Sequence, residues 1–197
     1  MCVCVCVCVY VYFLLGMIPG SVMLIRDHLR WCSVNPTRDI CVDNRFTTTA
    51  HVDSSAAYSP RLASLVRKIA ASEKIPFVEG NYCWTSGPTY ETPAEVQAGM
   101  ICGAGAFGMS TVPEVLSAHS LGMEVVAISL CTNLAAGLSD EVLTHDSVKQ
   151  VANEAGPRFQ KLLLEMVGLR TNKQTNKQTN KQTNKQTNKQ TNKQINK

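Results

Sequence analysis

The sequence predicts an α/β fold, and two observations along the chain support this class. Short apolar runs rich in β-branched and aromatic residues, which are typical of strands, alternate with segments whose apolar residues recur at helical spacing. Turn and capping signals separate these segments. The resulting order of strand and helix is expected for a sheet covered by helices, in which ligands collect near the carboxyl ends of the strands.

The first half of the chain holds two predicted strands and one helix. The apolar run at 21–25 predicts a buried strand that ends at the charged stretch 26–28, and residues 29–55 are polar and irregular. Apolar residues recur at helical spacing across 59–73. The stretch 77–85, rich in aromatic and β-branched residues, predicts the second strand.

A capping box opens the next predicted helix. Thr92 is a favourable N-cap, Pro93 suits the first helical position, and Glu95 can reach back to the N–H of Thr92. We expect this helix to run to about Cys102 and to be closed by Gly103.

The same capping device is expected once more. A short strand at 106–110 is followed by Thr111, with Pro113 and Glu114 behind it, which predicts a second capped helix that runs to Gly122.

The last predicted elements are a strand and a long helix. The apolar run at 125–131 is typical of a strand buried on both faces, and a loop at 133–144 follows it. A helix is expected over 146–167, although Pro157 inside it should cost about 3 kcal/mol or force a kink.

Both ends of the chain are low-complexity. Residues 1–19 form an apolar segment that begins with a Cys-Val repeat, and 169–197 contain six copies of TNKQ. Both repeats match translated simple-repeat DNA, so we expect a fragmentary gene product that includes non-coding sequence at its edges. The polar tail should be disordered, which leaves a domain at 20–168.

Charge and cysteine usage exclude some function classes. The formal net charge is +4, but 171–197 hold seven lysines and no acid, and the rest of the chain has 12 basic against 15 acidic residues. Nucleic acid is therefore not an expected partner. The cysteines outside the repeat are scattered without metal-ligand spacing, which fits a reduced, cytoplasmic protein without a metal. Residues 1–25 carry no charge, so a membrane anchor stays open, but we favour a repeat that runs into the first strand.

Four stretches in order resemble the trimeric class of purine nucleoside phosphorylases, in the family shared with methylthioadenosine phosphorylases. They are MLIRDHL (23–29), EGNYCWTSGPTYETPAE (79–95), GAFGMSTVPEV (105–115) and ISLCTNLAAGLSD (128–140). The resemblance implies a nucleoside-phosphorylase-like fold with a mixed central sheet flanked by helices, truncated at its N-terminus. It also implies a homotrimer when the protein is complete.

The resemblance implies an enzyme, a glycosyltransferase that transfers pentosyl groups. Such enzymes cleave purine nucleosides with inorganic phosphate into free base and ribose 1-phosphate, and phosphate is a co-substrate with no other cofactor. Glu91 would accept from N1–H of the purine and Asn133 would bond O6 and N7, a pair that fits a 6-oxopurine. The other implied contacts are Tyr82 and Met109 near the ribose, Tyr90 on the nucleoside, His145 at the 5′-hydroxyl and Ser110 on phosphate.

Each of these residues also has a structural reading. Glu91 suits a solvated charge at a helix start, Asn133 a turn, and Ser110 a helix cap. Met109 suits core filling, and the tyrosines suit packing.

Three functions stay open at this stage. The first is a 6-oxopurine phosphorylase of which the chain is an incomplete part. The family's N-terminal half, with most phosphate ligands, has no counterpart here, so we expect the chain alone to be inactive. The second is a catalytically inactive fragment, with a membrane tether as one form of it. The third is an enzyme of the methylthioadenosine phosphorylase type, whose members typically carry aspartate where this chain has Asn133.

Overall fold

The computed structural model describes part of the chain. The described residues are 2–8, 10–11, 17–33, 36, 41–42, 45–46, 53–139 and 144–168. The chain divides into two compact units, Met1–Met166 and Val167–Lys197. The tail predicted to be disordered lies outside the described residues. The fold described below is that of the first unit.

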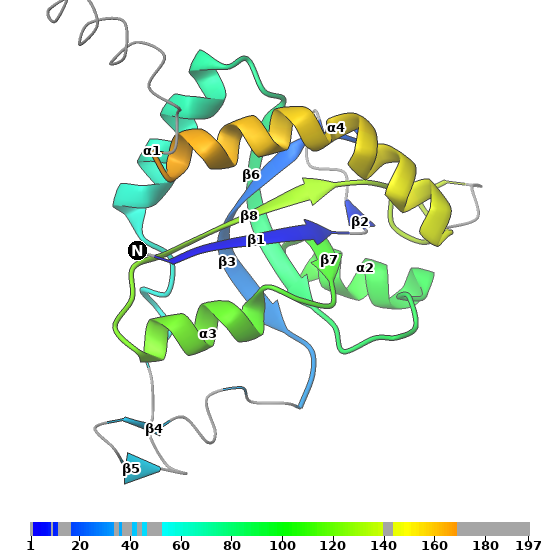
Figure 1. Ribbon diagram of the computed structural model, residues 1–197. Coiled ribbons are helices and arrows are strands. Elements are labelled where there is room, and N and C mark those ends of the chain that lie inside the picture. Colours follow the sequence, from blue (N-terminus) through cyan, green and yellow to red (C-terminus); the bar gives the residue numbers. More distant parts are fainter. Residues whose placement is uncertain are drawn as a thin grey trace, which may run out of the picture. The chain divides into compact units, whose positions relative to one another are not determined.

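A mixed sheet of six strands forms the centre of the described part of this unit, in the order β1-β8-β3-β6-β7-β2 (Figure 1). β3 runs parallel to β6 and β6 parallel to β7, whereas β8 runs antiparallel to β3. The predicted α/β fold with a mixed sheet is confirmed. The strands are β1 Cys2–Cys8, β2 Tyr10–Val11, β3 Val22–Arg30, β6 Phe77–Trp84, β7 Ala104–Gly108 and β8 Val125–Cys131, with β4 Cys41–Val42 and β5 Arg45–Phe46 as a separate pair.

Strand β3 is longer than the sequence predicts. The expected end at 26–28 is wrong, because the strand shifts register between Ile25 and Asp27 and then continues to Arg30. Beyond the shift it stays paired with β6, and His28 lies opposite Tyr82. Pairing with a strand about fifty residues away keeps this charged stretch extended.

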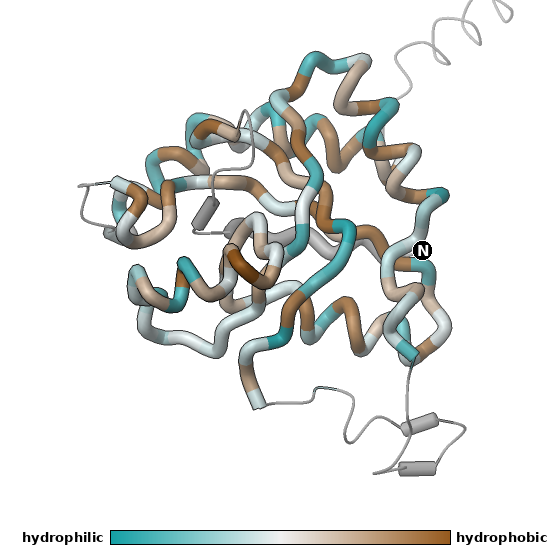
Figure 2. The backbone as a smooth tube through the Cα atoms, turned by 180° about the vertical axis from the view of Figure 1, so that it is seen from behind, coloured by the Kyte–Doolittle hydropathy of each residue, from teal (hydrophilic) through white to brown (hydrophobic). Residues whose placement is uncertain are grey.

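Helices cover the two faces of the sheet. Leu24 of β3 lies in an apolar cluster with Leu62 and Leu162. Its neighbour Met23 lies in a different cluster with Val115. Successive side chains of a strand point to opposite faces, so α1 and α4 cover one face and α3 covers the other (Figure 1). Figure 2 shows apolar stretches along the central strands. The helices are α1 Pro60–Ser72, α2 Pro93–Ile101, α3 Val112–Ser120 and α4 His145–Met166.

The two expected helix caps have different outcomes. At α2 the capping box is confirmed, since Thr92 Oγ1 accepts from the N–H of Glu95 and Glu95 Oε2 accepts from the N–H of Thr92. At α3 the prediction is wrong, because Thr111 has a φ of 74° and makes no side-chain cap hydrogen bond. Helix α4 continues through Pro157.

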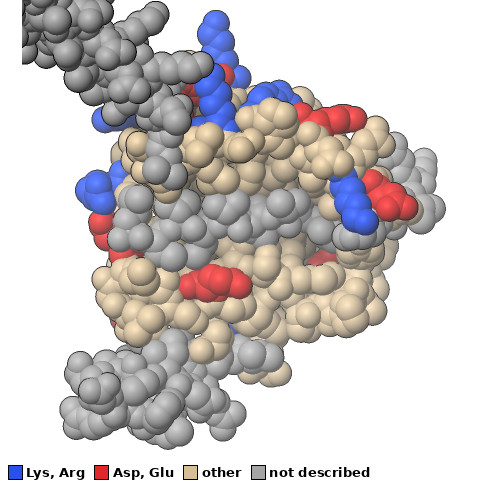
Figure 3. All heavy atoms as spheres, viewed as in Figure 1, with Lys and Arg blue, Asp and Glu red and all other residues tan. Residues whose placement is uncertain are grey.

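The Cys-Val repeat takes part in the sheet. It forms β1, which pairs in parallel with β8 from Cys2 opposite Val125 to Cys8 opposite Cys131. In the part of the chain that the structure describes, no helix combines the length and apolar character that crossing a membrane requires. On the face drawn in Figure 3, acidic and basic side chains are interspersed among the described residues.

Candidate active site

Three loops meet at one place in the fold. The loop after β6 contacts the loop after β7. Gly87 lies so close to Met109 that a Cβ atom added at Gly87 would collide with Sδ of Met109. The loop after β8 contacts the start of α2. A Cβ atom added at Gly137 would lie 2.8 Å from Cβ of Pro93. A common direction of the strands does not explain this meeting, since β8 is antiparallel to β3. The path of the loop after β8 brings it to α2.

Glu91, on the first of these loops, is a buried carboxylate. Its exposed fraction is 7%, and its Oε1 accepts a hydrogen bond of 2.6 Å from the hydroxyl of Thr85. Its Oε2 is buried and has no hydrogen-bond partner among the described residues. This burial does not fit a solvated charge at a helix start, because burying a carboxylate oxygen without a donor is unfavourable.

Asn133, at the start of the loop after β8, also has one side-chain atom in a hydrogen bond and one buried oxygen without a partner among the described residues. Its Nδ2 donates to Oγ of Ser147 over 3.2 Å, and the Ser147 hydroxyl donates to the carbonyl of Thr144 over 2.8 Å. The Oδ1 atom of Asn133 is buried and lacks a partner within the described part of the chain.

The loops that carry Glu91 and Asn133 share one packed cluster. Tyr90, which precedes Glu91, packs against the cluster that contains Ala135, two residues after Asn133. Each loop therefore brings one buried acceptor oxygen to this region. Buried polar atoms are nearly always paired in native proteins, so a ligand with suitable donors is a physical explanation for two orphaned acceptors.

The loop after β7 contains a strained residue. Thr111 has φ 74° and ψ −54°, and the N–H of Val112 donates to the carbonyl of Ser110 over 2.8 Å, which makes a γ-turn of the rare, strained kind. A β-branched residue at positive φ is a genuine outlier. The Oγ1 atom of Thr111 is buried without a partner among the described residues. Strain of this kind clusters at functional sites.

The remaining predicted site residues differ in exposure. Tyr90 is half-buried, and Met109 lies against Gly87. Tyr82 is fully buried in the cluster that also contains Val115. His145 is the first residue of α4, and its side chain lies outside the described part.

Cys83 is a buried thiol whose ionisation is influenced by the charge of Glu91. Burial, with a further contribution from the negative charge of Glu91, raises the pKa of Cys83 to about 12. The side chain is therefore a neutral thiol near pH 7 and not a nucleophile. Among the described residues, no group of His, Cys, Asp and Glu is arranged to hold a metal ion.

A family model described as the phosphorylase superfamily matches residues 15–168. The chain belongs to the phosphorylase superfamily. The purine nucleoside phosphorylase 1 of Bacillus subtilis is 41% identical over 148 residues, which are 75% of this chain and 54% of that protein. The resemblance inferred from the four sequence stretches is thereby confirmed. The chain spans about half the length of the curated phosphorylases that it matches.

Solved structures of phosphorylases have the same fold. The purine nucleoside phosphorylase of Schistosoma mansoni in complex with inosine aligns with a TM-score of 0.72 at 25% identity, over 84% of this chain and 59% of that chain. A variant adenosine/methylthioadenosine phosphorylase from the same organism, in complex with adenine, aligns with a TM-score of 0.75 at 18% identity. That alignment covers 85% of this chain and 65% of the other, and it shows the fold alone.

Two residues of this candidate site were not found from the sequence. Thr85 holds Glu91, and Ser147 holds Asn133. Thr85 lies six residues before Glu91, and Ser147 lies fourteen residues after Asn133. Neither spacing is a recognised motif. The one signal that could have indicated Thr85 is its place in the loop that also contains Glu91, which the sequence predicts to contact the purine.

Proposed function

We propose that the chain carries the base-recognition part of a purine nucleoside phosphorylase that acts on 6-oxopurine ribonucleosides or deoxyribonucleosides in purine salvage. In this reaction phosphate replaces the purine at C1′ and releases the free base and (deoxy)ribose 1-phosphate. The observation that carries the proposal is Oε2 of Glu91, a buried carboxylate oxygen without a hydrogen-bond partner among the described residues.

Glu91 supplies the discrimination between purine classes. A 6-oxopurine has an N–H group at N1, which a carboxylate oxygen can accept, whereas a 6-aminopurine has only a lone pair there. Placing that lone pair against Oε2 would leave two acceptors buried face to face. A site that is built to bond an N–H rejects an analogue that lacks it.

Asn133 acts at the other edge of the base. As the glycosidic bond breaks, negative charge grows on the purine, and a donor at N7 stabilises it. In the structure Nδ2 faces Ser147, and a half-turn of the amide would exchange its two ends. After that turn, Oδ1 would accept from the Ser147 hydroxyl, whose single proton would leave the carbonyl of Thr144. We assign Asn133 the contacts to O6 and N7.

The other contacts complete the proposed site. Ser110 immediately precedes the strained turn at the N-terminus of α3, where backbone N–H groups favour an anion, and we assign it to phosphate. Met109 and Tyr82 are assigned to the ribose side, Tyr90 to the nucleoside and His145 to the 5′-hydroxyl. The proposed protein is a cytoplasmic homotrimer that needs phosphate as co-substrate and no other cofactor, nucleic acid or membrane.

Binding of free bases tests the proposal, because it requires only the base readers. Isothermal titration calorimetry of the full chain should detect hypoxanthine and guanine and should give much weaker binding of adenine. Glu91→Gln should abolish this preference, since an amide can turn a donor or an acceptor toward N1. Equal affinity for hypoxanthine and adenine in the unaltered chain would contradict the proposal. Tighter binding of adenine would favour the methylthioadenosine phosphorylase type instead.

A further inference from the structure

Thr85 is held in place at the end of β6. Its backbone N–H donates to the carbonyl of Gly108, at the end of β7, over 3.0 Å. Threonine is β-branched, so its χ1 angle has few favourable values. The hydroxyl of Thr85 is therefore directed from a fixed backbone position by a stiff side chain.

This hydroxyl donates a hydrogen bond to the carboxylate of Glu91. The 2.6 Å between Oγ1 of Thr85 and Oε1 of Glu91 lies in the range of a charge-assisted hydrogen bond. An ionised carboxylate can only accept, so the proton of this bond comes from Thr85. Within the residues that the structure describes, Thr85 is the sole hydrogen-bond donor to this carboxylate.

The consequence is an asymmetric carboxylate. One oxygen is bonded by Thr85. The other is buried, has no partner among the residues described, and cannot rotate away without breaking a charge-assisted bond. A carboxylate held at one oxygen presents the second oxygen in a defined direction, which is what recognition of a single ligand N–H requires.

We propose that Thr85 is a positioning residue that fixes Glu91 for recognition of a ring N–H donor. The proposal rests on the function proposed above and adds the residue that determines how well Glu91 separates purine classes. Thr85 does not itself touch the purine in this account. Thr85 affects purine binding by fixing the orientation of the Glu91 carboxylate.

The first test measures hypoxanthine and adenine binding to the full chain by calorimetry. Thr85→Val removes the hydroxyl at nearly constant shape and should weaken hypoxanthine binding ~10- to 100-fold. Thr85→Ser keeps the hydroxyl and should stay within about threefold of the unaltered chain. In a Glu91→Gln background, Thr85→Val should have little further effect, because the two residues act through one interaction.

Two results would overturn the proposal. One is unchanged hypoxanthine binding by Thr85→Val. The other is equal weakening by Thr85→Ser and Thr85→Val, which would show that the methyl group, and thus packing alone, matters. Circular dichroism checks that each variant is folded, and Thr85→Ala serves as a second variant without the hydroxyl.

A second readout does not depend on purine binding. The carboxyl carbon resonance of Glu91, assigned by its absence in Glu91→Gln, reports directly on the hydrogen bond. It should move in Thr85→Val and stay close to its original position in Thr85→Ser. If the unaltered chain binds no purine, the proposed function fails, and this resonance still decides whether Thr85 holds the carboxylate of Glu91. A resonance that Thr85→Val leaves unmoved would exclude that role.

Discussion

Gly87 and Met109 are in such close contact that no side chain fits at position 87 without moving the methionine. Gly87 also has a φ of +60°, a conformation that other residues adopt at a cost. One glycine thus permits both the turn after β6 and its contact with the loop after β7. The loops of Glu91 and Ser110 are held together at this point.

Gly87→Ala should be strongly destabilising. We expect the positive φ to cost about 1–2 kcal/mol and the crowding of Met109 a further ~1–3 kcal/mol. Gly122→Ala is the matched control, because Gly122 has a φ of +73° but nothing within 4 Å of its added Cβ. Urea unfolding measures both losses. Equal losses for the two variants would show that the contact with Met109 is unimportant for stability.

Two threonines in the site should respond oppositely to valine. The Thr85 hydroxyl bonds a carboxylate, so Thr85→Val should lower the free energy of unfolding by about 1.5–3 kcal/mol. The Thr111 hydroxyl is buried without a partner in the described structure, so Thr111→Val should raise it by about 1 kcal/mol. Chemical denaturation checks both. A loss of stability in Thr111→Val would mean that its hydroxyl is paired.

The two glutamates around α2 should have separable roles. Glu95 belongs to the capping box, and Thr92→Ala should cost about 1 kcal/mol of stability through loss of that cap. Glu95→Gln keeps the capping acceptor and should change neither stability nor purine binding by much. Glu91→Gln should change the purine preference instead. A shift of purine preference in Glu95→Gln would contradict this separation, which calorimetry and thermal unfolding measure together.

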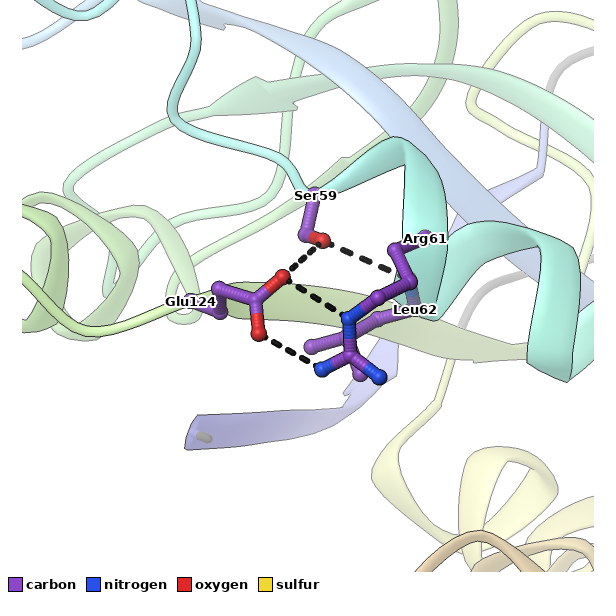
Figure 4. A network of polar contacts seen from close by, with 4 residues as sticks. All are labelled: Ser59, Arg61, Leu62 and Glu124. Carbon is purple, nitrogen blue, oxygen red and sulfur yellow. Dashed lines mark hydrogen bonds and ion pairs between the residues drawn. The ribbon is translucent and has the colours of Figure 1, made fainter.

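The ion pair at the start of α1 should make stability depend on pH. Arg61 bonds both carboxylate oxygens of Glu124, and Ser59 donates to one of them over 2.8 Å (Figure 4). The bond from Arg61, and then that from Ser59, lowers the pKa of Glu124 from 4.5 to about 2. A lowered folded-state pKa adds stability above the unfolded-state value, and this contribution is lost as the pH falls from 4.5 through about 2.

Substitution of either partner should remove that dependence. Glu124→Gln and Arg61→Met should each flatten the fall in unfolding free energy over this pH range, and the double variant should flatten it no further. Added salt should weaken the effect in the unaltered chain, because both groups are exposed. Unfolding midpoints measured between pH 2 and 6 test this. An unchanged profile in Glu124→Gln would assign the dependence to other carboxylates.

Local signals predicted local structure well. The box of Thr92, Pro93 and Glu95 acts within one helical turn, so its effect is readable from spacing alone, and the structure confirms it. Thr111 and Pro113 are residues of the same types, but Thr111 makes no side-chain cap hydrogen bond. At that site the γ-turn sets a positive φ that no local pattern indicates.

Contacts between residues far apart in the chain could not be predicted from the sequence. The continuation of β3 past its charged residues depends on pairing such as that of His28 with Tyr82. The resemblance of the motifs to the family predicts that Glu91 and Asn133 contact the purine, and this stays a prediction. That each keeps one buried oxygen without a partner in the described part of the chain could not be predicted, because it depends on the hydrogen bonds that Thr85 and Ser147 make in the folded structure.

A crystal structure of the full chain soaked with hypoxanthine tests the central claim most directly. The account predicts that N1–H of the base lies within about 3 Å of Oε2 of Glu91 and that Asn133 bonds the O6 and N7 edge. Thr85 should remain bonded to Oε1 in that complex. A base bound away from the loops of Glu91 and Asn133, or a Glu91 Oε2 that still has no partner when the base is present, would contradict the account.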